Sequence, residues 1–107
     1  MNDSAWQSVM EKYGQYISGG NELIDGETYS RVRLHVFYPD HTTAERVEGR
    51  VSDAIASKLR PVSEGMQPLT GANKYHVWCE ATLTGAQIKE YLITVISGGG
   101  EIWEVLI

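Results

Sequence analysis

The chain has 107 residues, of which 42% are hydrophobic and 21% charged, a composition typical of one folded domain covering residues 1–107. Nine basic and fourteen acidic residues give a net charge of −5, which disfavours nucleic acid as a partner. No apolar run reaches the roughly 18 residues of a membrane helix, and the single cysteine, Cys79, excludes an intrachain disulfide, so we expect a cytoplasmic protein without a membrane contact.

The N-terminal part, residues 1–20, predicts an amphipathic helix over 4–17. Five apolar residues recur at helical spacing along one stripe, namely Trp6, Val9, Met10, Tyr13 and Ile17. Gly19 and Gly20 supply a stop signal, and residues 24–27 have turn composition.

Residues 29–38 alternate so clearly that they predict a strand with two different faces. One face carries Val32, Leu34, Val36 and Tyr38, and the other Arg31, Arg33, His35 and Phe37. A helix over 43–59 follows, capped by Asp40 or by the pair Thr42 and Glu45. Its apolar stripe is Ala44, Val47, Val51, Ala54, Ile55 and Leu59, and we expect its other residues, which include Glu48, to face water.

The second half of the chain repeats this alternation of elements. Residues 62–69 contain Gly65 and Pro68 and predict a short edge strand. Residues 75–83 predict a strand with Tyr75, Val77, Cys79, Ala81 and Leu83 on one face and His76, Trp78, Glu80 and Thr82 on the other. Thr84 and Gln87 cap a third helix with the apolar set Ile88, Tyr91, Leu92, Val95 and Ile96, residues 98–100 are glycines that end it, and residues 101–107 predict a last strand.

This order of elements over residues 29–107 resembles the ferredoxin-like βαββαβ sandwich. The resemblance implies an α+β fold in which both crossover helices cover one face of a four-stranded antiparallel sheet, with the first and third strands central and adjacent. Two bacterial groups of this fold are similar in topology: ACT-like domains, whose last third also runs strand, helix, strand, and acidic regulators of a ribonuclease, which also place a helix before the core.

If the helices cover one face, the other face of the central strands is left with aromatic and basic side chains. The predicted partner-binding residues are Arg31, Arg33, His35, Phe37, His76, Trp78 and Glu80. The last strand adds Ile102, Glu104 and Leu106, or the alternate set. Three coverings of this face are open: the N-terminal helix, a second copy of the chain, and a foreign protein.

Catalytic chemistry has weak candidates. His35, His76 and Glu80 contain metal-binding groups but follow no ligand spacing, and Cys79 alternates onto the apolar face, away from both histidines. No carboxylate is predicted to lie in apolar surroundings with a raised pKa. Aromatic residues on central strands are also how RNA-binding sheets stack bases, but the net charge and the absence of the corresponding motif oppose that interpretation. We therefore expect no enzyme, metal or cofactor.

Three functions are consistent with these patterns. The first is a small acidic protein-binding module, such as an inhibitor, immunity or regulatory protein of a bacterium or phage, that occludes a nuclease or another nucleic-acid-binding protein. The second is an ACT-like dimer that senses a small anionic ligand near residues 42–43 or 84–85, where helices begin. The third is a component of a phage tail or neck, in which the domain forms a ring.

Overall fold

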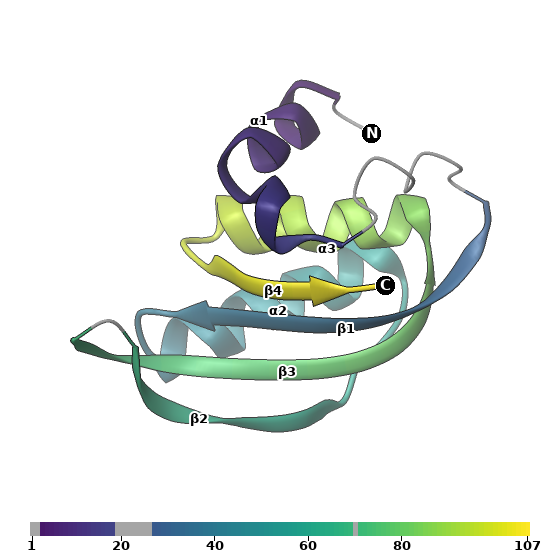
Figure 1. Ribbon diagram of the computed structural model, residues 1–107. Coiled ribbons are helices and arrows are strands. Elements are labelled where there is room, and N and C mark those ends of the chain that lie inside the picture. The colour runs from purple at the N-terminus through teal and green to yellow at the C-terminus, as the bar shows by residue number, and fades with distance from the viewer. Residues whose placement is uncertain (1–2, 19–26, 70) are drawn as a thin grey trace.

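Four antiparallel strands form one sheet in the order β2-β3-β1-β4, in a computed structural model that describes residues 3–18, 27–69 and 71–107 (Figure 1). The fold is α+β, as the sequence predicts, and β1 and β3 are the central, adjacent strands of the sheet. The elements are α1 (Asp3–Tyr13), the 3-10 turn η1 (Gly14–Tyr16), β1 (Tyr29–Tyr38), α2 (His41–Ile55), β2 (Pro61–Leu69), β3 (Ala72–Thr84), α3 (Gly85–Ser97) and β4 (Glu101–Leu106). The predicted stop at Gly19 and Gly20 and most of the turn at 24–27 lie outside the described residues.

The strand β1 shows the predicted alternation between its two faces. Val32, Leu34, Val36 and Tyr38 are all fully buried, whereas the side chains between them are exposed or half-buried. The register pairs His35 with Trp78 and Phe37 with His76 across β1 and β3. Side chains opposite one another in paired strands share a face, so the odd-numbered residues of β1 and the even-numbered residues of β3 lie together on the second face.

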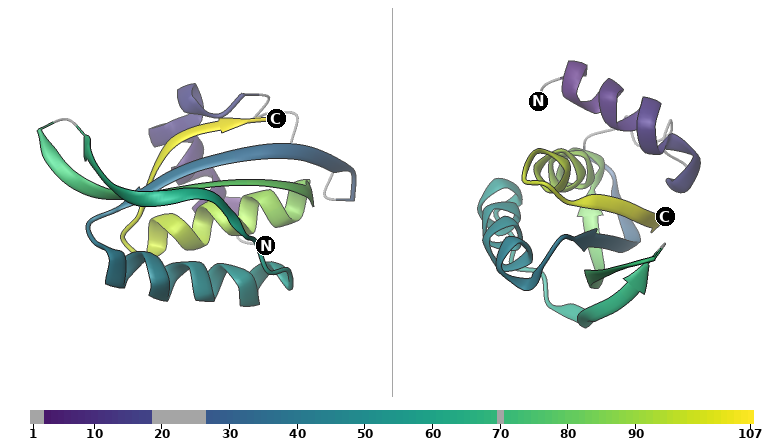
Figure 2. Two further views of the ribbon diagram at one scale, coloured as in Figure 1. Left: turned by 90° about the horizontal axis from the view of Figure 1, so that it is seen from below. Right: turned by 90° about the vertical axis from the view of Figure 1, so that its left-hand side faces the viewer.

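The helices α2 and α3 cover the face that carries the aliphatic side chains (Figure 2). Asp40 caps α2, because its Oδ1 accepts a hydrogen bond from the Thr43 backbone N–H at 2.7 Å, and the predicted pair of Thr42 and Glu45 does not form the cap. The helix ends at Ile55 rather than Leu59, since Ala56 adopts a left-handed conformation (φ 53°). Ala54, predicted in the apolar stripe, is exposed.

The start of α3 and its end follow the sequence prediction. Thr84 Oγ1 accepts from the Gln87 backbone N–H at 3.1 Å, and Gln87 Oε1 accepts from the Thr84 backbone N–H at 3.0 Å, which completes the capping box. Gly98 ends the helix. A Cβ on Gly100 would come within 2.7 Å of Tyr38 and Val95, so only glycine lets the chain turn this closely into β4.

The N-terminal helix does not lie over the uncovered face of the sheet. In the structure α1 packs against α3, and η1 lies beside β4 (Figures 1 and 2). Val9 and Tyr13 are buried in this contact, where the outer side of α3 offers the apolar side chains Ile93 and Ile96. Ile17 then forms a parallel bridge with Val105 at the outer edge of β4. The predicted apolar stripe is therefore right, and its partner is a helix of the same chain.

Candidate functional site

The side of the sheet opposite α2 and α3, here called the open face, carries all seven predicted site residues. It comprises Arg31, Arg33, His35 and Phe37 on β1, Lys74, His76, Trp78 and Glu80 on β3, Gln67 on β2, and Glu101, Trp103, Glu104 and Leu106 on β4. Their charges balance, with three basic and three acidic side chains. The rest of this acidic chain therefore carries the net negative charge.

Four aromatic rings form a continuous cluster in the middle of the open face. His35 stacks on Trp78 with ring centroids 5.1 Å apart and planes at 15°, and on His76 at 5.5 Å and 17°. Trp103 meets His76 edge-on at 4.8 Å and His35 at 6.1 Å. These four residues, His35, His76, Trp78 and Trp103, are called the aromatic cluster below. Such contacts add to the energy of burial and fix the rings relative to one another.

Trp103 reaches this cluster because β4 contains a bulge. The register shifts between His35 and Val36, which pair with Glu104 and Ile102, so that Trp103 is the additional residue. As a result, Ile102 and Val105 are buried while Trp103 is 42% exposed. Neither of the two alternating sets left open for the last strand is therefore right as a whole, because Glu104 and Leu106 come from one, Trp103 comes from the other, and Ile102 is buried. The three-residue spacing of Ile102 and Val105, in place of strict alternation, was the signal that could have shown this.

The two histidines of the cluster are in direct contact. His35 Nδ1 lies 3.3 Å from His76 Nε2, and the Gln67 amide Nε2 lies 3.4 Å from His76 Nδ1. With the Gln67 amide donating to Nδ1, the proton of His76 sits on Nε2 and is donated to His35. Only 5% of His76 is exposed, although it lies on the face that no helix covers.

Burial holds the pKa of both imidazoles below the ordinary value of a histidine. For His35 the desolvation is partly opposed by the Glu104 carboxylate and reinforced by the positive charge of Arg33. For His76 the pKa is lowered by burial first and by His35 second. Both rings are therefore kept neutral at neutral pH.

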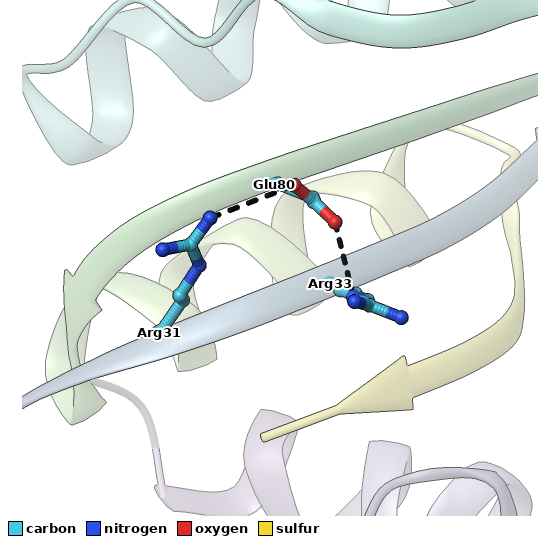
Figure 3. A network of polar contacts seen from close by, with 3 residues as sticks. All are labelled: Arg31, Arg33 and Glu80. Atoms are coloured by element: carbon cyan, nitrogen blue, oxygen red, sulfur yellow. Dashed lines mark ion pairs between the residues drawn. The ribbon is translucent and has the colours of Figure 1, made fainter.

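The arginines of β1 share one carboxylate on β3 (Figure 3). Arg33 Nε lies 3.0 Å from Glu80 Oε1, and Arg31 Nη2 lies 3.9 Å from Glu80 Oε2. The side chains of Arg31 and Arg33 remain 82% and 57% exposed, so both guanidinium groups can still reach another molecule. Because Glu80 turns to the arginines, it does not join the two histidines. Among the described residues, no group of three histidine, cysteine or acidic side chains is arranged to hold a metal ion.

At the other end of the strands, the open face continues into a groove beside the N-terminal helix. Lys74 Nζ lies 5.3 Å from the Phe37 ring centroid and 3.3 Å from Glu101 Oε2. The groove has a volume of about 400 Å³, and four aromatic side chains line it: Tyr13, Tyr16, Phe37 and Trp103. The N-terminal helix therefore extends the aromatic surface at its edge, without covering it.

A second polar site lies on the helix side of the sheet around Glu48, which we predicted to face water. Tyr38 donates a hydrogen bond to Glu48 Oε2 at 2.6 Å, and the Tyr91 hydroxyl lies 3.5 Å from both carboxylate oxygens. Burial raises the pKa of Glu48 above its ordinary value, and the two tyrosine hydrogen bonds oppose this rise. The expectation of no such carboxylate is therefore wrong. Its position next to Val47 and four residues after Ala44, at the border of the apolar stripe, was the available signal.

A cleft of about 180 Å³ opens beside Glu48, between α2 and the strands β2 and β3. Its lining includes the carboxylates of Glu45, Glu48 and Glu64, and among the described lining residues there is neither lysine nor arginine. Tyr75 donates a hydrogen bond to Glu64 Oε1 at 2.5 Å, and this bond raises the pKa of Tyr75 to about 12. The cleft is therefore acidic and disfavours a negatively charged ligand.

Cys79 is fully buried on the helix side, as its alternation predicts. Burial raises the pKa of its thiol to about 12, so the thiol stays protonated and unreactive at neutral pH. His35 and His76 lie on the opposite side of the sheet. Cys79 is thus a small core residue without a histidine to activate it.

No protein family model matches this chain, and neither a curated protein nor a solved structure matches it. No helix within the described ranges is long and apolar enough to cross a membrane. The function must therefore be inferred from the chemistry of the surfaces themselves.

Proposed function

We propose that this chain is a non-catalytic protein-binding domain that docks through its open face and occludes part of a partner protein. The observation that carries the proposal is the aromatic cluster, an array of two indoles and two imidazoles that no helix covers, flanked by two exposed arginines. Tryptophan, tyrosine and arginine are the residues most enriched in binding hot spots. The predicted contact residues, with Trp103 added, form one surface.

The architecture that we propose for this domain is ferredoxin-like. The strand order β2-β3-β1-β4, the antiparallel pairing of β1 with both β3 and β4, and the two helices on one face support it. The additional helix α1 packs on α3, and this position leaves the open face free for another molecule. A ferredoxin-like sheet serves many unrelated functions, so the role rests on the side chains of the open face.

A protein fits the open face better than a nucleic acid does. A base that stacks on a sheet needs a free ring surface, whereas His35 already stacks against both Trp78 and His76. The open face is also electrically balanced, and the rest of the chain is acidic. Acidic charge outside the contact steers a basic partner toward the domain. We therefore propose a partner with a basic surface, such as a nuclease or another nucleic-acid-binding protein, and an inhibitor, immunity or regulatory role.

The test is site-specific photocrosslinking in the cells of origin. A photoreactive amino acid replaces Leu106, an exposed open-face residue beside Arg33, and a matched control replaces Asp53, which is exposed on α2. We expect one discrete adduct with a foreign protein from position 106, lost when Arg33→Ala or Trp103→Ala is added. Equal adducts from both positions would contradict the proposal, and adducts with the same chain alone would indicate a homodimer instead.

The captured protein then permits a quantitative check by calorimetry with purified components. Trp103→Ala should raise the dissociation constant at least tenfold, which corresponds to a loss of about 1.4 kcal/mol in binding free energy. Asp53→Ala should change it less than twofold. Equal effects of the two variants would show that the complex does not use the open face.

The ligand-sensing alternative receives less support. A cleft does lie at the start of α2, where an ACT-like ligand site would be expected, but its three carboxylates disfavour the anion that we expected there. Sedimentation at high concentration and a thermal-shift panel of anionic and amine metabolites test this alternative. A monomer without any ligand-induced shift would remove it. A ring-forming phage component, the third prediction, would form discrete higher oligomers in the same sedimentation experiment.

A further inference from the structure

Neither histidine of the aromatic cluster can bind an additional proton without losing a hydrogen bond that it makes in the neutral state. With the Gln67 amide donating to His76 Nδ1, the hydrogen of neutral His76 is on Nε2 and is donated to His35 Nδ1 across 3.3 Å. A proton added to His35 must enter at Nδ1, where it faces the N–H of His76, so the hydrogen bond is lost. A proton added to His76 enters at Nδ1 and faces the amide nitrogen of Gln67, 3.4 Å away, so the amide must turn. Each protonation therefore forces the cluster to rearrange.

The charged groups around the pair do not hold such protons in place. On β1, Arg33 repels a positive charge on His35, and on β4, Glu104 attracts it without forming a hydrogen bond to either ring among the described residues. On β3, Glu80 is paired with Arg33 and Arg31, and Lys74 is paired with Glu101 of β4. The contact from β2 is the uncharged Gln67. An imidazolium inside the closed cluster is thus surrounded by rings and is poorly solvated.

The closed cluster also leaves one polar group unsatisfied. The indole N–H of Trp78 is buried and has no hydrogen-bond partner in the described part of the chain. A buried donor without an acceptor weakens the arrangement that contains it. Separation of the rings would expose this N–H to water or to an acceptor on another molecule. Opening therefore satisfies a donor at the same time as it solvates the imidazoles.

We propose that His35 and His76 form a proton-operated switch: mild acid breaks the hydrogen bond of His76 with Gln67 and that of His35 with His76, and separates the imidazoles from Trp78 and Trp103. The aromatic cluster then has a closed form, in which the rings are in contact, at neutral pH and an open form, in which they are separated, at lower pH. Burial lowers the pKa of both rings, so the closed form is fully stable above pH 6.5 and is lost as the pH falls through their lowered values. The effect on a partner rests on the protein-binding function proposed above, whereas the opening itself does not.

The experiment follows the two open-face indoles in the free, full-length protein. Trp6→Phe removes the third tryptophan, which lies on α1, and acrylamide quenching of fluorescence is measured from pH 7.5 to 4.5. We expect the quenching constant to rise at least twofold with a midpoint below pH 6.5, reversibly, while the far-ultraviolet circular dichroism stays constant. A quenching constant that does not change with pH would overturn the proposal, as would a rise that coincides with loss of helical dichroism.

Matched variants assign the transition to the pair. His35→Gln and His76→Gln should each abolish it, and two variants guard against the failure of one to fold. His41→Gln should leave it intact, because His41 packs on Tyr75 at the start of α2, and Glu48→Gln should also leave it intact, because Glu48 lies on the helix side. Persistence of the transition in both open-face variants, or its loss in His41→Gln, would contradict the assignment. A normal transition together with failed crosslinking would leave the switch standing and reject the partner proposal alone.

Discussion

The two faces of the sheet use the same strands in different ways. On the helix side, Val32, Leu34 and Val36 of β1 are fully buried in a core that includes aliphatic side chains of α2 and α3. On the open side, His35 and Trp78 stack on each other, and the two helices α2 and α3 lie on the opposite face of the sheet. The first arrangement is stabilised by burial of apolar surface. The second is held by ring contacts and two long hydrogen bonds, so it can rearrange without loss of the fold.

The polar groups on the two faces sharpen this contrast. Burial favours the neutral form of Glu48 on the helix side and of the histidine pair on the open side, but the direction of the pKa change is opposite for an acid and a base. Acidification therefore stabilises the helix side, where Glu48 becomes protonated and neutral. It destabilises the open side, where the imidazoles become charged. A change in pH should thus act on the two faces with opposite signs.

The largest expected effect is a loss of stability from a core truncation. Leu34→Ala should lower the free energy of unfolding by about 2–5 kcal/mol, because it leaves a cavity between the sheet and the helices. Urea unfolding followed by circular dichroism measures this change. A loss below about 1 kcal/mol would show that the helix side is less tightly packed than its burial indicates.

A smaller effect is expected from the half-buried carboxylate of Glu48. Its folded-state pKa is raised, so Glu48 contributes its full stability below its ordinary pKa near 4.5 and loses it as the pH rises through the raised value. Glu48→Gln should remove this dependence and make the protein more stable than wild type at pH 8, where the carboxylate of Glu48 is charged. Unfolding free energies at pH 5 and 8 test this, with Glu45→Gln, at an exposed position of the same helix, as the control variant.

The smallest effect on stability is expected next to Leu34, on the opposite face. Arg33→Ala should change the free energy of unfolding by less than about 1 kcal/mol, because the ion pair with Glu80 is solvent-exposed and such pairs contribute little. The same urea experiment measures it. A loss as large as that of Leu34→Ala would show that the open face is part of the folding core, and would remove the distinction between the two faces.

The sequence was informative wherever one rule of periodicity applied to a whole element. The two-residue period of β1 and β3 places every side chain from Arg31 to Tyr38, because the register pairs the strands without a break along this stretch. The capping box of Thr84 and Gln87 is equally local, and it was found from two residues. The residues that β1 and β3 contribute to the open face were therefore predicted from the sequence alone, with the exception of Lys74, which precedes the predicted strand at 75–83.

The features that were missed depend on contacts between elements. A bulge turns Trp103 outward, and it forms only where β4 meets the His35–Val36 step of β1. Glu48 lies at the border of a helical stripe, and it is the hydroxyl of Tyr38, from another element, that draws it inward. For the N-terminal helix, the apolar stripe with Val9 and Tyr13 predicts that the helix packs on an apolar surface, but the sequence does not indicate that this surface belongs to α3.

The borders of the sheet limit how copies of this molecule can join. On one side, β2 contains Pro61 and Pro68, which have no backbone N–H to donate, together with an irregular step between Pro61 and Ser63. On the other, Ile17 and Ser18 already occupy backbone positions along β4. Both edge strands are therefore poorly able to pair with a strand of another copy of the chain. A concentrated solution of this protein should therefore resist fibril formation, although none of the described helices covers the open face.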